Sequence, residues 1–144
     1  MNIARRMSRG SVSVEVALLV PVLVLVAALA TAGWRIWWAG AQVRAAAEAA
    51  ARAASVQVSV AKAGAVVDEV VAADLRTAGL HCRDIKVDVN LTAVGLPPGV
   101  AGTVTVSVTC AVALDDLLVP GLPGSITVGG QAVESIDMFR SRGR

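Results

Sequence analysis

The sequence predicts an α+β protein with a long N-terminal transmembrane helix, a second amphipathic helix and a small antiparallel β-sheet. Three observations predict this fold class: an uncharged apolar run over residues 16–34, apolar residues at helical spacing over 61–78, and two alternating segments, 85–92 and 103–110. Hydrophobic residues make up 56% of the 144-residue chain. That content exceeds the average for a soluble domain, so we expect a membrane segment plus one small soluble domain.

The apolar run has the length and flanks of a membrane span. Residues 16–34 would form about 28 Å of helix, close to the thickness of the bilayer hydrocarbon. Three arginines within the first nine residues precede the run and only one follows closely, which favours a cytoplasmic N-terminus. Trp34, Trp37 and Trp38 lie at the far end, where indole rings favour the membrane interface. We therefore expect one pass through the cytoplasmic membrane, with the chain after about residue 35 outside the cytoplasm.

Two residues of this segment need a specific explanation. Glu15 stands directly before the uncharged run, and an isolated carboxylate next to hydrocarbon is costly and therefore a functional candidate. The alternative is a carboxylate that snorkels to the cytoplasmic headgroups. Pro21 lies inside the run and removes a backbone hydrogen bond, which usually kinks a helix. A functional kink and a harmless proline in an early turn both remain open, since transmembrane helices tolerate proline.

The junction before the run carries a family signature. Arg9-Gly10 ends a short basic leader, and Glu15 is the fifth residue after the glycine. This pattern resembles the processing site of type IV prepilins and pseudopilins. The continuation Val14-Glu15-Val16-Ala17-Leu18, with Pro21 three residues on, is similar to the TadE-like minor pilins of the tight-adherence (Flp) pilus system. The family usually carries Phe at the position of Val16.

The resemblance implies a pilin-like layout and a structural role. Together with the patterns of the residues themselves, it predicts a basic leader over 1–10, a transmembrane and stem helix over 11–54, an extracytoplasmic α+β domain over 55–139 and a charged tail over 140–144. It also implies cleavage by a prepilin peptidase between Gly10 and Ser11, with other pilins or pseudopilins and the inner-membrane assembly platform as partners. Glu15 and Pro21 would then both serve assembly. For Glu15 the reason is that a carboxylate can pair with the new terminal amine of a neighbouring subunit in a medium of low dielectric constant.

A different class of function remains open. Ala30-Thr31-Ala32 matches the A-x-A pattern of a signal-peptidase site. Cleavage near Ala32 would release an exported binding module, and an uncleaved helix would anchor such a module in the membrane.

The soluble part reads as one helix and several strands. Residues 61–78 predict an amphipathic helix, with Gly79 as its C-terminal cap and Leu80 as the hydrophobic contact of the cap. Residues 55–60 fit either a short strand or a join between helices. The segments 85–92 and 103–110 predict an antiparallel pair with the valines facing inward.

Two further patterns complete the soluble part. Gly129-Gly130 between β-prone runs predicts a tight hairpin. Cys82 and Cys110 are the two cysteines, and an even pair in an exported domain favours a disulfide over two free thiols. With His81 they lack the ligand spacing of a zinc site.

Other functions find no support in the sequence. The net charge is +2, and the chain has three Trp, one Phe and no Tyr, so it lacks the basic and aromatic stripe typical of nucleic-acid binding. The single histidine has no evident nucleophile to activate, and no phosphate-binding loop is present. We therefore expect no catalytic, cofactor or metal site.

Overall fold

The structure, a computed structural model, describes residues 9–97, 99–117 and 123–137, with the side chains of 9–14 and 116–117 left out. Most of the expected basic leader and all of the expected charged tail lie outside the described residues. By its internal contacts the chain divides into two units, Met1–Trp34 and Arg35–Arg144. The helix α1 (Arg9–Ser55) contributes its apolar N-terminal part to the first unit and its alanine-rich remainder to the second.

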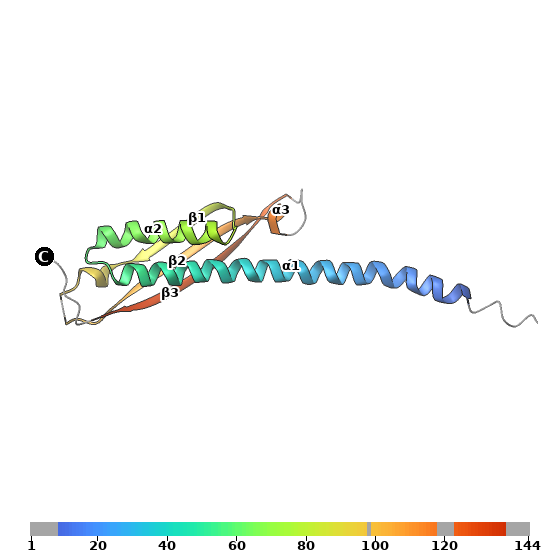
Figure 1. The fold of residues 1–144 in the computed structure, drawn as a ribbon, viewed down its shortest axis with the longest axis horizontal. Helices are drawn as coiled ribbons and strands as arrows, with labels where there is room; N and C mark the ends of the chain where they lie inside the picture. The colour runs from blue at the N-terminus through green and yellow to red at the C-terminus, as the bar shows by residue number, and fades with distance from the viewer. Residues whose placement is uncertain (1–8, 98, 118–122, 138–144) are drawn as a thin grey trace, which may run out of the picture. The chain divides into compact units, whose positions relative to one another are not determined.

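The second unit combines helices with one sheet. Its further elements are α2 (Val60–Thr77), β1 (Cys82–Asn90), the 3-10 turn η1 (Thr92–Gly95), β2 (Gly102–Ala113), the short α3 (Leu114–Leu117) and β3 (Ser125–Ile136) (Figure 1). The long N-terminal helix, the second helix and the small antiparallel sheet confirm the predicted α+β fold class.

The segment between the two long helices is a join. Helix α1 ends at Ser55 and α2 begins at Val60, so the strand alternative for 55–60 is wrong. Ser59 has extended backbone angles (φ −138°, ψ 146°), and its hydroxyl oxygen accepts a hydrogen bond of 3.3 Å from the backbone N–H of Lys62. This N-cap satisfies one of the backbone donors that open a helix, which fixes where α2 starts.

The C-terminal end of α2 follows the predicted cap. Gly79 takes φ +70°, a left-handed angle that glycine adopts without a steric cost. The N–H of Leu80 donates to the carbonyl of Leu75, and that of Gly79 to the carbonyl of Arg76, both at 3.0 Å. These two bonds define a Schellman motif, in which Leu80 and Leu75 supply the buried hydrophobic contact.

The sheet has the order β1-β2-β3, with both neighbouring pairs antiparallel. The predicted pairing of the two alternating segments is confirmed, since Val87 lies opposite Val108 and Val89 opposite Val106. The central strand β2 is buried at every second residue from Val104 to Val112. Because β1 is an edge strand, its inner face is less covered, and Ile85 keeps 43% of its surface exposed.

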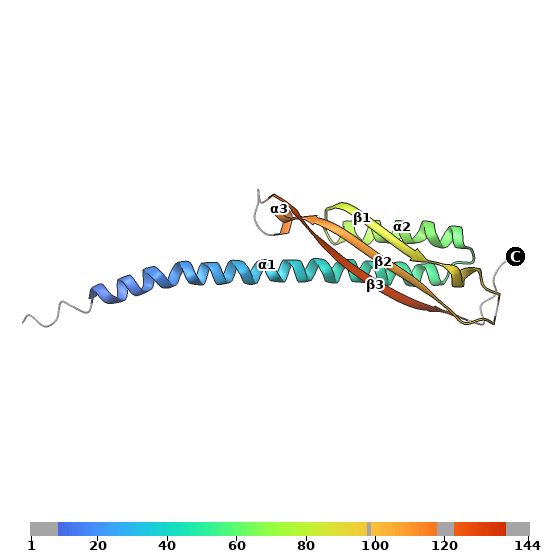
Figure 2. The same ribbon diagram turned by 180° about the vertical axis from the view of Figure 1, so that it is seen from behind.

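Helices α1 and α2 cover the same face of the sheet (Figures 1 and 2). Helix α2 buries a stripe at helical spacing, Ala63, Val67, Val71 and Leu75. The contribution of α1 is mostly alanine, and its buried residues are Ala39, Val43, Ala46, Ala47, Ala50, Ala51 and Ala54. Small side chains let the helix backbone come close to its neighbours, so α1 is a core element of this unit rather than a solvated spacer.

The predicted Gly129-Gly130 hairpin is wrong. Strand β3 runs unbroken from Ser125 to Ile136, with Gly129 opposite Thr109 and Gly130 opposite Val108 on β2. The reason is a close approach of helix and strand. A Cβ at Gly130 would lie 2.4 Å from the Cα and 2.7 Å from the backbone nitrogen of Arg44. Glycine within a strand often marks a place where another backbone comes near, and here that backbone belongs to α1.

Candidate functional site

The first candidate site is the apolar part of α1. The described residues contain one helix, over Glu15–Ser55, that is long and apolar enough by length and composition to cross a membrane. Its large apolar side chains between Val16 and Leu29 are each exposed over more than half of their surface. Burial of these side chains in hydrocarbon would be favourable, because transfer of apolar surface out of water is. The helix therefore supports membrane anchoring.

The expected processing and assembly residues all lie on this helix. Gly10 and Ser11 fall in the first turns of α1, Glu15 is exposed at the start of the apolar run, and Pro21 lies inside the helix. The assigned helix continues through Pro21 without interruption. The arrangement sets a single carboxylate beside a long uncharged surface. The roles of these four residues remain predictions.

The three tryptophans lie within a stretch of about five residues of α1, near the division between the two units. Trp34 is 65% exposed, Trp37 64% and Trp38 37%, so none of the three indoles is buried in the hydrophobic core. Exposed indole rings that close an apolar run are typical of residues at a membrane interface. Their interfacial role remains a prediction.

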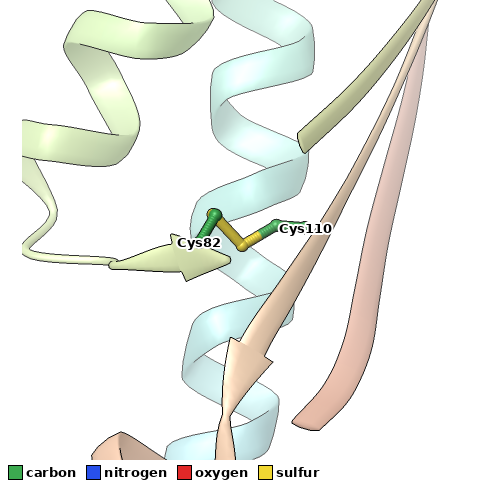
Figure 3. The surroundings of a disulfide bond; sticks show 2 residues. All are labelled: Cys82 and Cys110. Atoms are coloured by element: carbon green, nitrogen blue, oxygen red, sulfur yellow. A yellow bond between two sulfur atoms is a disulfide. The ribbon is translucent and has the colours of Figure 1, made fainter. Parts of the chain in front are cut away.

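The cysteine pair is a disulfide, as the sequence favoured. Cys82 at the start of β1 and Cys110 on β2 are bonded to each other, with a Cα–Cα distance of 5.4 Å (Figure 3). Cys110 is fully buried, and the bond joins positions 28 residues apart in the sequence. The register of β1 shifts between Cys82 and Asp84, so the bridge ties the irregular end of β1 to the central strand.

A second candidate site was missed by the sequence analysis. An open groove of about 440 Å³ lies between one flank of α1 and β3, lined by Ile36, Trp37, Gly40, Ala41, Arg44, Ala45, Glu48 and Gly129. The signal was present in the sequence as the glycine pair, which we read as a turn instead of as a place of close backbone approach.

The described residues give no support to a metal centre. Among them, no three His, Cys, Asp or Glu side chains lie together in an arrangement that would hold a metal ion. Two ion pairs lie at the surface of the second unit: Arg83 Nη2 is 3.6 Å from Asp115 Oδ1, and Arg52 Nη1 is 3.9 Å from Glu134 Oε1.

Fold and candidate sites together define a class of protein: a small disulfide-bonded α+β unit carried by an exposed apolar N-terminal helix. Within this class, residues 10–52 match the family model of TadE-like proteins, which confirms the predicted resemblance. The match is consistent with a TadE-like protein of the Tad/Flp pilus system, a structural family not known for enzymatic activity. No curated protein and no solved structure matches the chain.

Proposed function

We propose that the chain is a minor pilin or pseudopilin that takes part in assembling a tight-adherence pilus or a related secretion apparatus. The observation that carries this proposal is the TadE-like match, which starts at Gly10 and covers the whole apolar run. The exposed apolar surface of α1 adds to it, since a helix with that surface needs hydrocarbon or other helices around it.

Processing between Gly10 and Ser11 is the first step of the proposed mechanism. A prepilin peptidase would remove the basic leader and leave a protonated amine on Ser11. Glu15 follows four residues later in α1, about 6 Å along the helix axis. Its carboxylate would pair with the amine of a neighbouring subunit, and the low dielectric constant of the bilayer would strengthen that attraction and penalise either charge alone.

The second unit would lie outside the cytoplasm in this proposal. Arginines before the apolar helix favour an N-terminus on the cytoplasmic side. The Cys82–Cys110 bridge supports the same orientation, because structural disulfides persist in oxidising compartments and are rare in the cytosol. The partners would be other pilins or pseudopilins, the inner-membrane assembly platform and the bilayer itself.

An exported binding module remains the second candidate, and one observation favours it. The division between the two units falls at Trp34, two residues after Ala32. Cleavage by a signal peptidase near Ala32 would therefore remove the first unit and leave the second complete.

The mature N-terminus distinguishes these candidates. The full chain is co-expressed with a prepilin peptidase, and its intact mass and terminal sequence are determined. We expect a chain that starts at Ser11. A start at Gly33 would support the exported module, and an unprocessed Met1 would support a plain membrane anchor; either result would overturn the pilin proposal.

Glu15 is tested separately from processing. We expect Glu15→Gln to insert into the membrane and to be processed like the wild type, but to be recovered in the assembled pilus fraction at a level at least tenfold lower. Glu69→Gln, an exposed glutamate on α2, is the matched control and is expected to assemble normally. Equal recovery of the two variants would remove the docking role of Glu15 and leave the snorkelling explanation.

A further inference from the structure

The two edges of the sheet differ in how they are protected against strand addition. Edge strands expose unpaired backbone groups, and natural proteins block them with charged residues, proline or bulges. Strand β1 carries Arg83, Asp84, Lys86 and Asp88 among its nine residues, and its register is irregular at one end. Strand β3 has Glu134 as its one charged residue, no proline and an unbroken register over twelve residues.

The far edge of β3 is free in the described part of the chain. All twelve residues of β3 pair with β2 on one side, and the sheet order places no strand on the other side. Val133, on the sheet face opposite to the helices, is 58% exposed. The outer edge of β3 therefore offers a long row of backbone donors and acceptors with little to repel a partner.

Helix α1 runs alongside this strand in the same direction. Arg44 touches Gly130, and eight residues later Arg52 forms an ion pair with Glu134. Eight helical residues advance about 12 Å, and the four strand residues from 130 to 134 advance about 13 Å, so the two elements stay level over this distance. The groove along the flank of α1 meets this strand at Gly129, the one residue of β3 in its lining.

We propose that the β3 edge and this groove together bind an extended segment of another protein chain by strand addition. The backbone of that segment would pair with the free edge of β3, and every second side chain would enter the groove. The small side chains of Ala41 and Ala45, together with Gly40, leave room there, and Trp37 supplies an apolar contact. This inference goes beyond the proposed pilus function and does not depend on processing at Gly10 or on Glu15.

The charges of the groove specify the chemistry of the segment. Arg44 and Glu48 are both exposed and lie one helical turn apart, about 6 Å along α1. Same-face side chains of a strand repeat about every 6.6 Å, so two alternate positions can face both charges. Antiparallel addition is slightly more stable than parallel, and such a segment passes Glu48 before Arg44. Its groove-facing sequence is therefore basic-x-acidic, flanked by small apolar residues.

A second copy of this chain fits the site poorly. Antiparallel pairing of two β3 edges would set residues 35–55 of the two α1 helices in opposite directions. Two chains anchored in one bilayer by their N-terminal helices need the same direction. The other edge of a second copy is β1, whose four charged residues block pairing. The partner is therefore a different chain.

The test uses the full-length, isotope-labelled chain in detergent micelles. The probe is a ten-residue synthetic peptide of alternating Val and Thr with a central Lys-x-Glu, compared with its Glu-x-Lys reversal. We expect saturating Lys-x-Glu peptide to slow amide hydrogen exchange along the free edge of β3 at least tenfold, and the reversed peptide to bind at least fivefold more weakly.

A charge-swapped variant provides the matched control. Arg44→Glu with Glu48→Arg changes two exposed side chains and keeps the helix formers, so the fold should persist, as the exchange rates of β2 will show. In this variant we expect the preference to invert in favour of Glu-x-Lys. The proposal is overturned if neither peptide protects β3, if protection appears on β1 or only over residues 16–34, or if the swap leaves the preference unchanged.

Discussion

Replacing Gly130 by alanine tests the close approach of α1 and β3 directly. The new Cβ would lie 2.4, 2.7 and 3.0 Å from the Cα, N and Cβ of Arg44, all of which move only with the helix. Ordinary carbon contacts are about 3.5–4.0 Å, so α1 must shift by about 1 Å or more. Overpacking of this kind costs about 1–3 kcal/mol. The lower entropy of the unfolded alanine chain offsets about 0.4–1 kcal/mol, so the middle of the two ranges leaves a net loss of about 1–2 kcal/mol.

The neighbouring glycine is a matched control. A Cβ at Gly129 would lie 3.4 Å from Thr109 Cγ2 and 3.5 Å from the carbonyl oxygen of Val108, which is ordinary contact. Gly129→Ala should therefore leave the free energy of unfolding unchanged or raise it by up to about 1 kcal/mol. The two substitutions are the same in chemistry and adjacent in sequence, so they differ only in the neighbours that the new Cβ would meet: α1 at Gly130 and β2 at Gly129.

Amide hydrogen exchange of the full chain in detergent micelles measures the difference. The amides of β2, the central strand, report the opening of the sheet. A loss of about 1–2 kcal/mol corresponds to roughly 5–30-fold faster exchange. We expect this acceleration for Gly130→Ala and none for Gly129→Ala. If Gly130→Ala exchanges as slowly as the wild type, the helix does not press on β3 and the physical reason given for the glycine pair is wrong.

Three further predictions concern the second unit. Replacing Cys82 and Cys110 together by alanine should lower the free energy of unfolding by about 3–4 kcal/mol, because the lost bridge closes a loop of 28 residues. Chemical denaturation measures this loss when the variant is compared with the wild type, with and without reductant. Leu75→Ala should lower the free energy of unfolding by about 2–5 kcal/mol, since Leu75 is 2% exposed. Val56→Ala, at a 63% exposed position, should change the midpoint of chemical denaturation little. Gly79→Ala should lower the free energy of unfolding by about 1–2 kcal/mol, because Gly79 has a φ of +70°. Gly79→Asn should lower it less, so its thermal unfolding midpoint should lie between those of Gly79→Ala and the wild type.

Local signals were sufficient for the parts of the fold that local physics determines. The alternation around Val87 and Val106 predicted β1 and β2, because period-two burial follows from the pleat of a strand. The apolar spacing up to Leu75 and the glycine at 79 predicted α2 and its end, because both the amphipathic stripe and the left-handed cap act within one helix.

The parts that failed depend on contacts between distant segments. Gly129-Gly130 has the composition of a turn, and only the approach of Arg44, more than eighty residues earlier in the chain, explains why the strand continues. The groove beside α1 was missed for the same reason, since its lining combines residues 36–48 with Gly129. Cys82 and Cys110 were a more favourable case, because with only two cysteines the pairing had no competitor.

The alanine-rich core has one more consequence. No polar or charged side chain is buried among the residues that the structure describes. An interior of this kind holds no acid or base that must gain or lose a proton when the unit unfolds, so a change of pH acts on groups at its surface. Acid and alkali therefore find no group to titrate among the buried side chains that the structure describes, and their effect on this unit falls on the charges at its surface.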